Sequence, residues 1–584
     1  MADKDIAMKP QKRMVLYQMM TRLFSNTNLT NKPWGTKDEN GVGTMNEITS
    51  KALKVLRKQG YTHIWYTGII EHALLSDYTA YDIALDDADV VKGRAGSPYA
   101  IKDYFDINPD LAQQVEDRMQ EFENLVARTH KEGIKVIIDF VPNHVARKYH
   151  SDAKPQNIDD FGQKDDTSLS FDPDNNFYYL PGEEFKVPNG YKTLGDYSFP
   201  TKTGPFEESP AKASGNNVFL AQPSVFDWFE TIKLNYGVDL QNSHQKHFDP
   251  IPDTWIKMKE ILLYWCEKKV DGFRCDMAEM VPVEFWRWVT DEVKKTYPDV
   301  LFIAEVYQPE AYRTYIHDGG FDYLYDKVEM YDTLKAIVQG KSSADHITQV
   351  WQQQEGIGQN MLRFLENHDE QRIASPEFAG DMRKGIPMMA ASAFMHEGPI
   401  MMYFGQDVGE PALGLSGFSG DDGRTTIFDY WGVPEHIKWV NNGKFDGGQL
   451  SADQKTLQKD YLQIIQIINQ KRALQIGAFF DLQYFNRCAA YTGYSDGVYS
   501  FLRYIDDERL LVVINFKEES EAVQIKIPEL ALEMMKLDRQ ELVFSFNTQV
   551  LTKDQQDLSN HYIGSAVMFN VPALQYIIVS INNK

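Results

Sequence analysis

The sequence predicts an α/β protein whose main part is a (β/α)₈ TIM barrel. Strand-like apolar runs alternate with amphipathic segments over much of the chain, which is typical of a parallel sheet covered by helices. In addition, four apolar runs end in charged or polar residues, at residues 136–144, 272–276, 301–305 and 364–369. A barrel of this class builds its functional site from side chains at the carboxyl ends of its strands.

The individual elements follow from periodicity and from glycine stops. Two early amphipathic segments end at Gly60 and Gly133, as helices commonly do. The expected strands span residues 14–19, 63–67, 134–140, 270–275, 301–304, 361–366 and 400–404. The expected helices span residues 47–59, 111–132, 255–269, 285–297 and 457–474.

Two stretches depart from this rhythm. Residues 141–237 are rich in Asp, Asn, Gly, Pro, Ser and aromatic residues, and a structureless loop of that length is improbable in a compact domain. After Gly477 short alternating runs predict an antiparallel β-sandwich. The predicted domains are a barrel at 1–140 and 238–477, an inserted domain at 141–237 after the third strand, and a C-terminal sandwich at 478–584.

Composition excludes several classes of partner. The 584 residues contain 60 Lys and Arg against 84 Asp and Glu, a net charge of −24, which disfavours nucleic acid and anionic membranes. Three cysteines, Cys266, Cys275 and Cys488, do not form a disulfide framework. No apolar run reaches membrane-spanning length, and residues 1–10 lack the apolar core of a signal peptide. We therefore expect a cytoplasmic protein, although a trimmed secreted form would look the same.

The acids at the strand ends suggest cleavage of a glycosidic bond. That reaction needs a carboxylate on one side of the sugar and a proton donor on the other, about 5–5.5 Å apart in retaining enzymes. Asp276 and Glu305 end consecutive predicted strands and suit this pair. Arg274 lies two residues before Asp276 and so points to the same face, where it would keep the carboxylate ionised. A buried barrel salt bridge is the competing interpretation of Arg274 and Asp276.

The other two acids differ in their surroundings. Glu305 follows four apolar residues, which would raise its pKa as a general acid requires. Asp369 follows Asn367 and His368 at a strand end. It could bind sugar hydroxyls and favour an oxocarbenium-like state, or it could simply cap the next helix.

These segments, in order, resemble the conserved regions of the α-amylase family, glycoside hydrolase family 13. The matching segments are residues 139–144, 272–276, 304–306 and 366–369, together with 78–81 and 403–410. The resemblance spans Tyr17 to about Gly477 with the expected insertion. It implies a barrel (domain A), an inserted domain B and a C-terminal sandwich.

The resemblance also implies roles for individual residues. Asp276 would attack the anomeric carbon, Glu305 would be the acid and then the base, and Asp369 would complete the catalytic triad. The expected substrate-binding residues are Tyr78, Tyr81, Asp139, His144, Arg274 and His368. Of these, Tyr81 would stack on the −1 sugar. Trp228 and Tyr236 in the inserted segment are further stacking candidates.

The sequence also departs from the family pattern. Glu279 and Met280 stand where many α-amylases have Lys-His, and Thr79 stands where many have His. Contacts around the cleaved bond are therefore open.

Family members often bind a structural Ca²⁺ between domains A and B. Here Asn143 and Asn235 are the candidate ligands, but Lys233 replaces an expected Asp. An ammonium group disfavours calcium, which needs several oxygen ligands. No cofactor is expected for the chemistry itself.

The leading hypothesis is a retaining α-glucan hydrolase that cleaves α-1,4 bonds of starch, glycogen or maltodextrins, with an α-glucan or maltooligosaccharide as its partner. An α-glucanotransferase would share the same triad and covalent intermediate. An exo-acting glucosidase is disfavoured by Tyr78, because such relatives often have Asp there. A non-catalytic glycan-binding barrel is disfavoured because all three acids are present. Chain-length preference and oligomeric state do not follow from the sequence.

Overall fold

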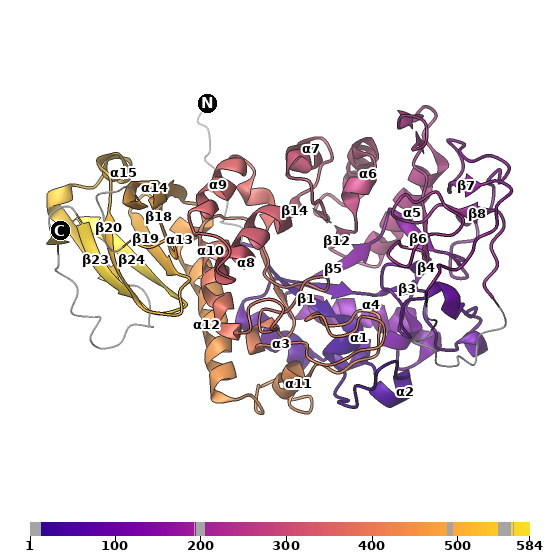
Figure 1. Ribbon diagram of the computed structural model, residues 1–584, viewed down its shortest axis with the longest axis horizontal. Coiled ribbons are helices and arrows are strands. Elements are labelled where there is room, and N and C mark those ends of the chain that lie inside the picture. Colours follow the sequence, from indigo (N-terminus) through magenta and orange to yellow (C-terminus); the bar gives the residue numbers. More distant parts are fainter. Residues whose placement is uncertain are drawn as a thin grey trace.

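A parallel eight-stranded barrel forms the centre of the molecule (Figure 1). The computed structural model describes residues 13–191, 193, 205–487, 494–546, 562–563 and 566–583. The barrel strands are β1 (Val15–Met20), β2 (His63–Thr67), β5 (Lys135–Phe140), β12 (Gly272–Cys275), β13 (Leu301–Ala304), β14 (Tyr323–Tyr325), β15 (Met361–Leu362) and β16 (Ile400–Tyr403). Their neighbours pair in parallel, and a bridge between Arg363 and Ile400 closes the ring. The predicted (β/α)₈ class is confirmed.

Two strands differ from the prediction because they are very short. β14 has only three residues and was not expected, since three residues cannot show an alternating pattern. β15 covers two residues of the expected 361–366. After the bridge from Arg363 to Ile400 the described chain makes no further strand pairs up to Glu366, so the apolar character of Phe364 and Leu365 reflects burial.

The helices cover the outside of the barrel. α3 (Ser50–Gln59) is capped by Thr49 and ends at Gly60, whose φ of 106° suits only glycine without strain. α4 (Arg118–Lys131) starts later than predicted because two 3₁₀ turns precede it. Further helices up to the C-terminal part are α1 (Thr21–Phe24), α2 (Lys37–Asn40), α5 (Asp253–Glu267), α6 (Val283–Thr296), α7 (Tyr312–His317), α8 (Asp332–Val338), α9 (His346–Gln353), α10 (Gly385–Phe394), α11 (Pro434–Val440), α12 (Ala452–Gln470) and α13 (Arg472–Ile476). The C-terminal part adds α14 (Gln483–Arg487) and α15 (Glu529–Met535).

The segment between β5 and α5 forms small two-stranded sheets at the end of the molecule away from the C-terminus (Figure 1). β6 (His144–Ala146) pairs with β9 (Thr231–Lys233), and β7 (Tyr179–Leu180) pairs with β8 (Ala211–Lys212). A second excursion, which the sequence did not predict, follows β2: β3 (Ile70–His72) pairs with β4 (Ile101–Ile107). A further hairpin joins β10 (Val238–Asp239) to β11 (Gln245–Lys246).

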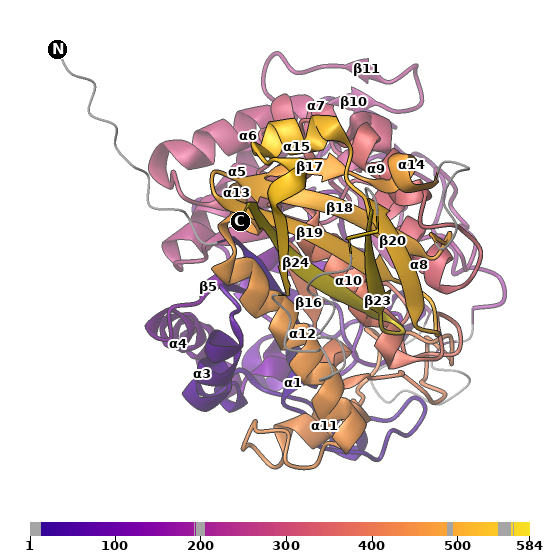
Figure 2. The ribbon, with the colours of Figure 1, turned by 90° about the vertical axis from the view of Figure 1, so that its left-hand side faces the viewer.

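The C-terminal part consists of two antiparallel sheets (Figure 2). One contains β17 (Ala478–Asp481), β18 (Val498–Ile505), β19 (Glu508–Asn515), β21 (Leu542–Phe546) and β24 (Gln575–Asn583). The other contains β20 (Glu521–Lys526), β22 (Tyr562–Ile563) and β23 (Ala566–Val571). Along β19, Leu510, Val512 and Ile514 join the barrel core, whereas Leu511 and Val513 join the core of the sandwich. One face of β19 therefore packs on the barrel, where it contacts α10. Because α10 lies between the barrel and this sheet, all of its residues are buried.

Two sequence expectations concern cysteines and membranes. Cys266 and Cys275 are buried free thiols, while Cys488 and residues 1–10 lie outside the described residues. None of the helices that the structure describes is long and apolar enough to cross a bilayer.

Candidate active site

Two acids follow neighbouring barrel strands at the same end of the barrel. β12 and β13 pair in parallel with Cys275 opposite Ala304, so Asp276 and Glu305 come directly after matched positions. The ladder continues to the acids: the N–H of Asp276 donates to the carbonyl of Phe140 at 2.9 Å, and the N–H of Glu305 donates to that of Cys275 at 3.1 Å. Backbone pairing therefore fixes both carboxyl groups at the carboxyl end of the sheet.

Arg274 connects the two acids through one buried guanidinium. Its Nη1 lies 2.7 Å from Asp276 Oδ1, and its Nη2 lies 2.9 Å from Glu305 Oε1 in an ion-pair contact without hydrogen-bond geometry. Nη1 is also 3.7 Å from Asp139, and Nε donates to the hydroxyl of Tyr325 at 3.1 Å. Burial alone would lower the pKa of Arg274, but the surrounding carboxylates raise it well above its ordinary value. The cation is therefore permanent, and it holds both acids on one side of the site.

Glu305 has the surroundings of a proton donor. Its Oε2 accepts the N–H of Met277 at 2.8 Å, and its Oε1 accepts the hydroxyl of Tyr307. Burial raises the pKa of Glu305 to about 7, while Arg274 opposes this rise and Asp276 adds to it. A carboxyl group with this pKa can give up a proton and take one back near neutral pH.

The pKa values of the other two acids shift in opposite directions, upward for Asp276 and downward for Asp369. Burial raises the pKa of Asp276, but the ion pair and hydrogen bond with Arg274 act against that rise. For Asp369 burial also acts upward, yet His368 and Arg274 outweigh it and lower the pKa below its ordinary value. Asp369 therefore favours its ionised form, and Glu305, whose pKa is about 7, can exchange a proton near neutral pH.

A tyrosine and a histidine pack together beside Asp369. The Tyr99 and His368 rings stack with centroids 5.1 Å apart, and the Tyr99 hydroxyl lies 2.6 Å from His368 Nε2. The same nitrogen is 2.9 Å from Asp369 Oδ2. On its far side the His368 ring contacts the amide of Gln18 at 2.8 Å, and Tyr99 also reaches Asp139 at 3.4 Å. These contacts fix the rings at the wall of the site.

The acids open into one cavity of about 280 Å³. Its lining residues are Lys92, Ser97, Tyr99, His144, Trp228, Glu230, Thr231, Asp276, Met277, Glu305, Tyr307, Asp369, Ile427 and Phe428. This volume is near the lower end of the roughly 300–1,000 Å³ typical of small-molecule sites. The enclosed volume therefore suits a small molecule or a short segment of a longer ligand, the rest of which would lie along the protein surface.

The cavity is lined by four of the nine predicted catalytic and substrate-binding residues and by several residues that were missed. Asp276, Glu305, Asp369 and His144 line it, and Trp228 lies with its ring 5.2 Å from that of His144. Among the missed residues are Lys92, Tyr99, Glu230 and Tyr307. Tyr307 could have been found, because it follows Glu305 by two residues. The others come from excursions whose folding the sequence pattern does not show.

The predicted roles of Tyr78 and Tyr81 require correction, because neither lines the cavity with the acids. The Tyr78 hydroxyl donates to Asp110 at 2.5 Å, and Tyr81 lies on a short 3₁₀ turn with 36% of its surface exposed. Tyr99 occupies the wall position instead. The difference arises because the chain passes through the excursion of β3 and β4, which places Tyr99 at the cavity wall. The sequence pattern did not show this excursion, so Tyr81 was assigned to that position.

Tyr236 is likewise not available to a substrate in this cavity. It is buried, its hydroxyl donates to the carbonyl of Pro142 at 2.7 Å, and its ring packs on Phe285. Of the two aromatic candidates in the inserted segment, Trp228 alone lines the cavity with the acids.

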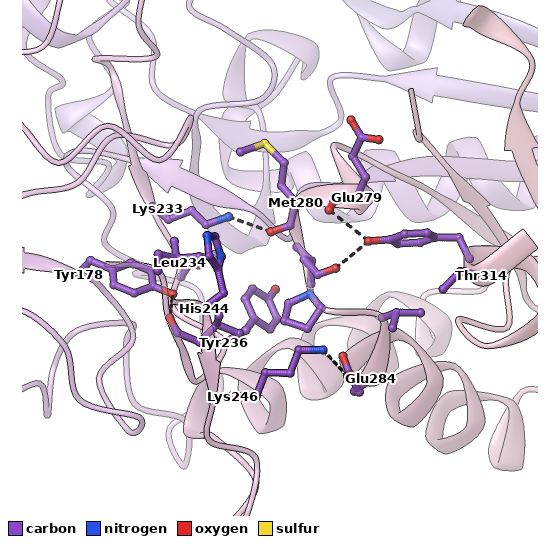
Figure 3. A pocket seen from close by; sticks show the side chains of 16 residues that line it. Tyr178, Lys233, Leu234, Tyr236, His244, Lys246, Glu279, Met280, Glu284 and Thr314 are labelled. Atoms are coloured by element: carbon purple, nitrogen blue, oxygen red, sulfur yellow. Dashed lines mark hydrogen bonds and ion pairs between the residues drawn. The ribbon is translucent and has the colours of Figure 1, made fainter. Parts of the chain in front are cut away.

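The residues at the expected calcium position do not fit that ion. Lys233 donates from its ammonium to Asn143 Oδ1. It also donates at 3.0 Å to the carbonyl of Met280 (Figure 3). Asn235 is turned elsewhere: its Oδ1 accepts the N–H of Gly237 and its Nδ2 donates to the carbonyl of Asp172. A cation already lies against Asn143, and these two asparagines supply no carboxylate, whereas calcium prefers six to eight oxygen ligands.

Comparison with known proteins identifies the family of this chain. Residues 18–423 match the family model described as alpha amylase, catalytic domain. An α-amylase of Dictyoglomus thermophilum is 22% identical over 93% of this chain and 88% of its own length. A cyclomaltodextrinase of Thermoanaerobacter pseudethanolicus is 22% identical over 92% of this chain and 77% of its own.

Solved structures show the same fold over the whole chain. A noncanonic maltogenic α-amylase of Thermotoga neapolitana has a TM-score of 0.61 at 17% identity and covers 99% of this chain and 100% of its own. An α-amylase of Geobacillus thermoleovorans, solved in complex with acarbose, has a TM-score of 0.58 at 19% identity and covers 98% of each chain. The chain described here belongs to the α-amylase family of glycoside hydrolases.

Proposed function

We propose that this chain is a retaining hydrolase that cleaves α-1,4-glucosidic bonds of starch, glycogen or maltodextrins through a covalent intermediate. The observation that supports it most is the shared guanidinium of Arg274, which contacts Asp276 at 2.7 Å and Glu305 at 2.9 Å. Two carboxyl groups on one guanidinium are close neighbours. Such a pair suits the double-displacement mechanism, which needs a separation of about 5–5.5 Å.

The first step uses the ionisation states described above. The Asp276 carboxylate attacks the anomeric carbon while the bond from that carbon to the leaving oxygen breaks. Glu305 gives its proton to that oxygen, and the shortened chain leaves with a new hydroxyl group. Asp369 and His368, 2.9 Å apart, would hold sugar hydroxyls as positive charge develops on the ring.

The second step reverses the proton transfer. Glu305, now a carboxylate, takes a proton from a water molecule, whose oxygen attacks the anomeric carbon. The ester bond to Asp276 breaks and its carboxylate is regenerated. Two inversions at the same carbon give net retention, so the first product is the α-anomer.

The proposal is tested by incubating the purified chain with maltoheptaose and with soluble starch. Chromatography resolves product sizes, and proton NMR in the first minutes identifies the anomer released. Shorter oligosaccharides in the α-form are expected. Release of the β-anomer would contradict the retaining mechanism, products longer than maltoheptaose would indicate an α-glucanotransferase, and no change on either substrate would contradict the assigned glucan class.

Replacing Tyr99 by alanine is expected to lower kcat/KM about 10- to 100-fold. The Tyr99 ring forms the wall of the cavity and stacks on His368, so its loss removes an apolar surface for the sugar and frees the histidine. Burial of an aromatic surface and its stacking are together worth roughly 1.5–3 kcal/mol. Initial rates on maltoheptaose measure the effect.

Tyr81→Ala is the matched control, because this tyrosine does not line the cavity and lies exposed nearby in the sequence. Its kcat/KM should stay within about threefold of the wild type, as for an ordinary exposed side chain. A larger loss in Tyr81→Ala than in Tyr99→Ala would restore the original assignment of Tyr81.

A further inference from the structure

Lys233 is a buried lysine without an acidic partner. Only 3% of its surface is exposed, and no carboxylate lies within ion-pair distance of it among residues 13–191, 193, 205–487, 494–546, 562–563 and 566–583. The other buried lysines, Lys102 and Lys257, each contact an aspartate, Asp86 at 3.2 Å and Asp253 at 2.9 Å. Burying an ammonium costs several kcal/mol unless its donors are satisfied, and burial lowers the pKa of Lys233 to about 7, so this lysine needs an explanation.

The acceptors of Lys233 belong to two different parts of the barrel end. Asn143 follows β5, and its Nδ2 donates to the carbonyl of Gly215 at 2.9 Å, which leaves Oδ1 to face the ammonium. Met280 follows β12 and accepts through its backbone carbonyl at 3.0 Å. Lys233 itself lies in β9, which pairs with β6. One side chain therefore joins the inserted segment to the loops after two barrel strands.

The Met280 carbonyl belongs to the turn directly behind the proposed nucleophile. The N–H of Met280 donates to the carbonyl of Met277 at 2.9 Å, and Met277 follows Asp276 in the left-handed conformation with φ 42°. That conformation is costly for a side chain such as methionine and needs support from its surroundings. The N–H of Met277 also donates to Glu305, so the geometry of this turn affects both proposed catalytic acids.

We propose that Lys233, through its ammonium group, joins domain B to the 277–280 turn and thereby positions Asp276 and Glu305. It occupies the space between Asn143 and Met280 that a metal ion would need. Lys233 is a positioning residue, since it acts through the turn and does not line the cavity with the acids. The effect on turnover rests on the proposed function, whereas the presence of a cation site can be measured separately.

The surroundings of Lys233 allow the cation to be replaced. Lys233, Met280, Tyr236 and Glu279 line a second cavity of about 310 Å³ (Figure 3). Removing the side chain by Lys233→Ala would leave a vacancy that opens into this cavity. We expect a small organic cation to enter this vacancy and donate hydrogen bonds to Asn143 Oδ1 and the carbonyl of Met280.

The experiment compares Lys233→Ala and Lys233→Met with the wild type, with and without ethylammonium chloride. Both variants should lose about 10- to 100-fold in kcat on maltoheptaose with KM changed less than threefold. Ethylammonium should raise kcat of Lys233→Ala at least about fivefold and raise its Tm in a concentration-dependent way, because a bound ligand stabilises the folded state. n-Propanol, a neutral molecule of similar size, should do neither.

Lys246→Ala is the matched control, because Lys246 lines the same cavity but forms an exposed pair with Glu284 at 2.5 Å. Its kcat should equal that of the wild type, and ethylammonium should change neither its kcat nor its Tm. Wild-type kcat in Lys233→Met would overturn the proposal, because that variant keeps the length of the side chain without its charge. A folded Lys233→Ala whose kcat and Tm both ignore ethylammonium would also overturn it. The Tm response needs no turnover, so failure of the proposed function alone would leave that response intact.

Discussion

Asp276→Asn is expected to lower kcat on maltoheptaose by at least about 10⁴-fold while the protein stays folded. The amide has the shape of the carboxylate but cannot form the ester with the anomeric carbon. The environment already disfavours the charge, since burial raises the pKa of Asp276. Loss of the carboxylate leaves Arg274 in contact with Glu305 at 2.9 Å and Asp139 at 3.7 Å, so the guanidinium keeps acidic partners. Circular dichroism and Tm establish folding, and initial rates establish the loss.

Asp407→Asn is a suitable control for this variant. Asp407 is another buried acid after a barrel strand, but its carboxylate accepts from Gln458 at 2.7 Å and it does not line the cavity. Its kcat should remain within a few-fold of wild type. Sodium azide provides a second check, since the small anion can attack the anomeric carbon in place of Asp276 and would yield a glucosyl azide of inverted configuration. Near wild-type hydrolysis by Asp276→Asn would remove Asp276 as the nucleophile.

The sequence predicted the barrel and the acids because both depend on local pattern. Apolar runs that end in polar residues mark parallel strands, and strands in parallel register bring their carboxyl ends together regardless of the loops between them. Arg274 and Asp276 were expected on one face from their spacing of two, and their contact at 2.7 Å agrees with that expectation. The roles assigned to these residues remain proposals.

The walls of the cavity could not be predicted in the same way. Tyr99 reaches His368 only because β3 and β4 form an antiparallel excursion after β2, and no local pattern places that excursion against a residue 269 positions further along. Lys92 and Glu230 meet at 2.8 Å through two separate loops. Such contacts depend on tertiary packing of irregular backbone, for which periodicity gives no signal.

Lys233 lies between these two cases. The sequence showed that a lysine stands where the family often has an aspartate, and this argued against calcium at Asn143. It did not show what the lysine does. The structure places the ammonium against Asn143 and the carbonyl of Met280, so the substitution that removes an anionic ligand also supplies a cation.

The second large effect is expected for Glu305→Gln, which should lower kcat/KM on maltoheptaose about 10³-fold, within the range for loss of a general acid. The amide cannot protonate the leaving oxygen. A substrate such as α-glucosyl fluoride needs no such proton in the first step, so the variant should form the covalent intermediate from it at a far less reduced rate. Equal losses on both substrates would contradict the role of Glu305 as the acid.

The pH dependence of the wild type gives an independent test of the same residue. Glu305 must be protonated to act as the acid, and burial raises its pKa to about 7, so kcat/KM should fall as the pH rises through about 7. This alkaline limb should be absent for α-glucosyl fluoride in the formation step. Tyr307→Phe should move the limb to higher pH, because the Tyr307 hydroxyl donates to the carboxylate and favours its ionised form. An unchanged limb in that variant would assign the titration to another group.

The raised pKa of Glu305 also predicts how the stability of the fold depends on pH. This dependence is opposite to that of a carboxylate in a salt bridge, whose stabilisation is lost as the pH falls. Because Glu305 binds its proton more tightly in the folded state than in the unfolded state, its contribution to stability is complete below about pH 4.3 and is lost as the pH rises through about 7. Glu305→Gln carries no titrating group, so its Tm relative to the wild type should increase between pH 5 and pH 8. The acid would then be held in a destabilising environment because catalysis near neutral pH requires it. A Tm difference that does not change with pH would show that the environment of Glu305 leaves its proton affinity unaltered on folding.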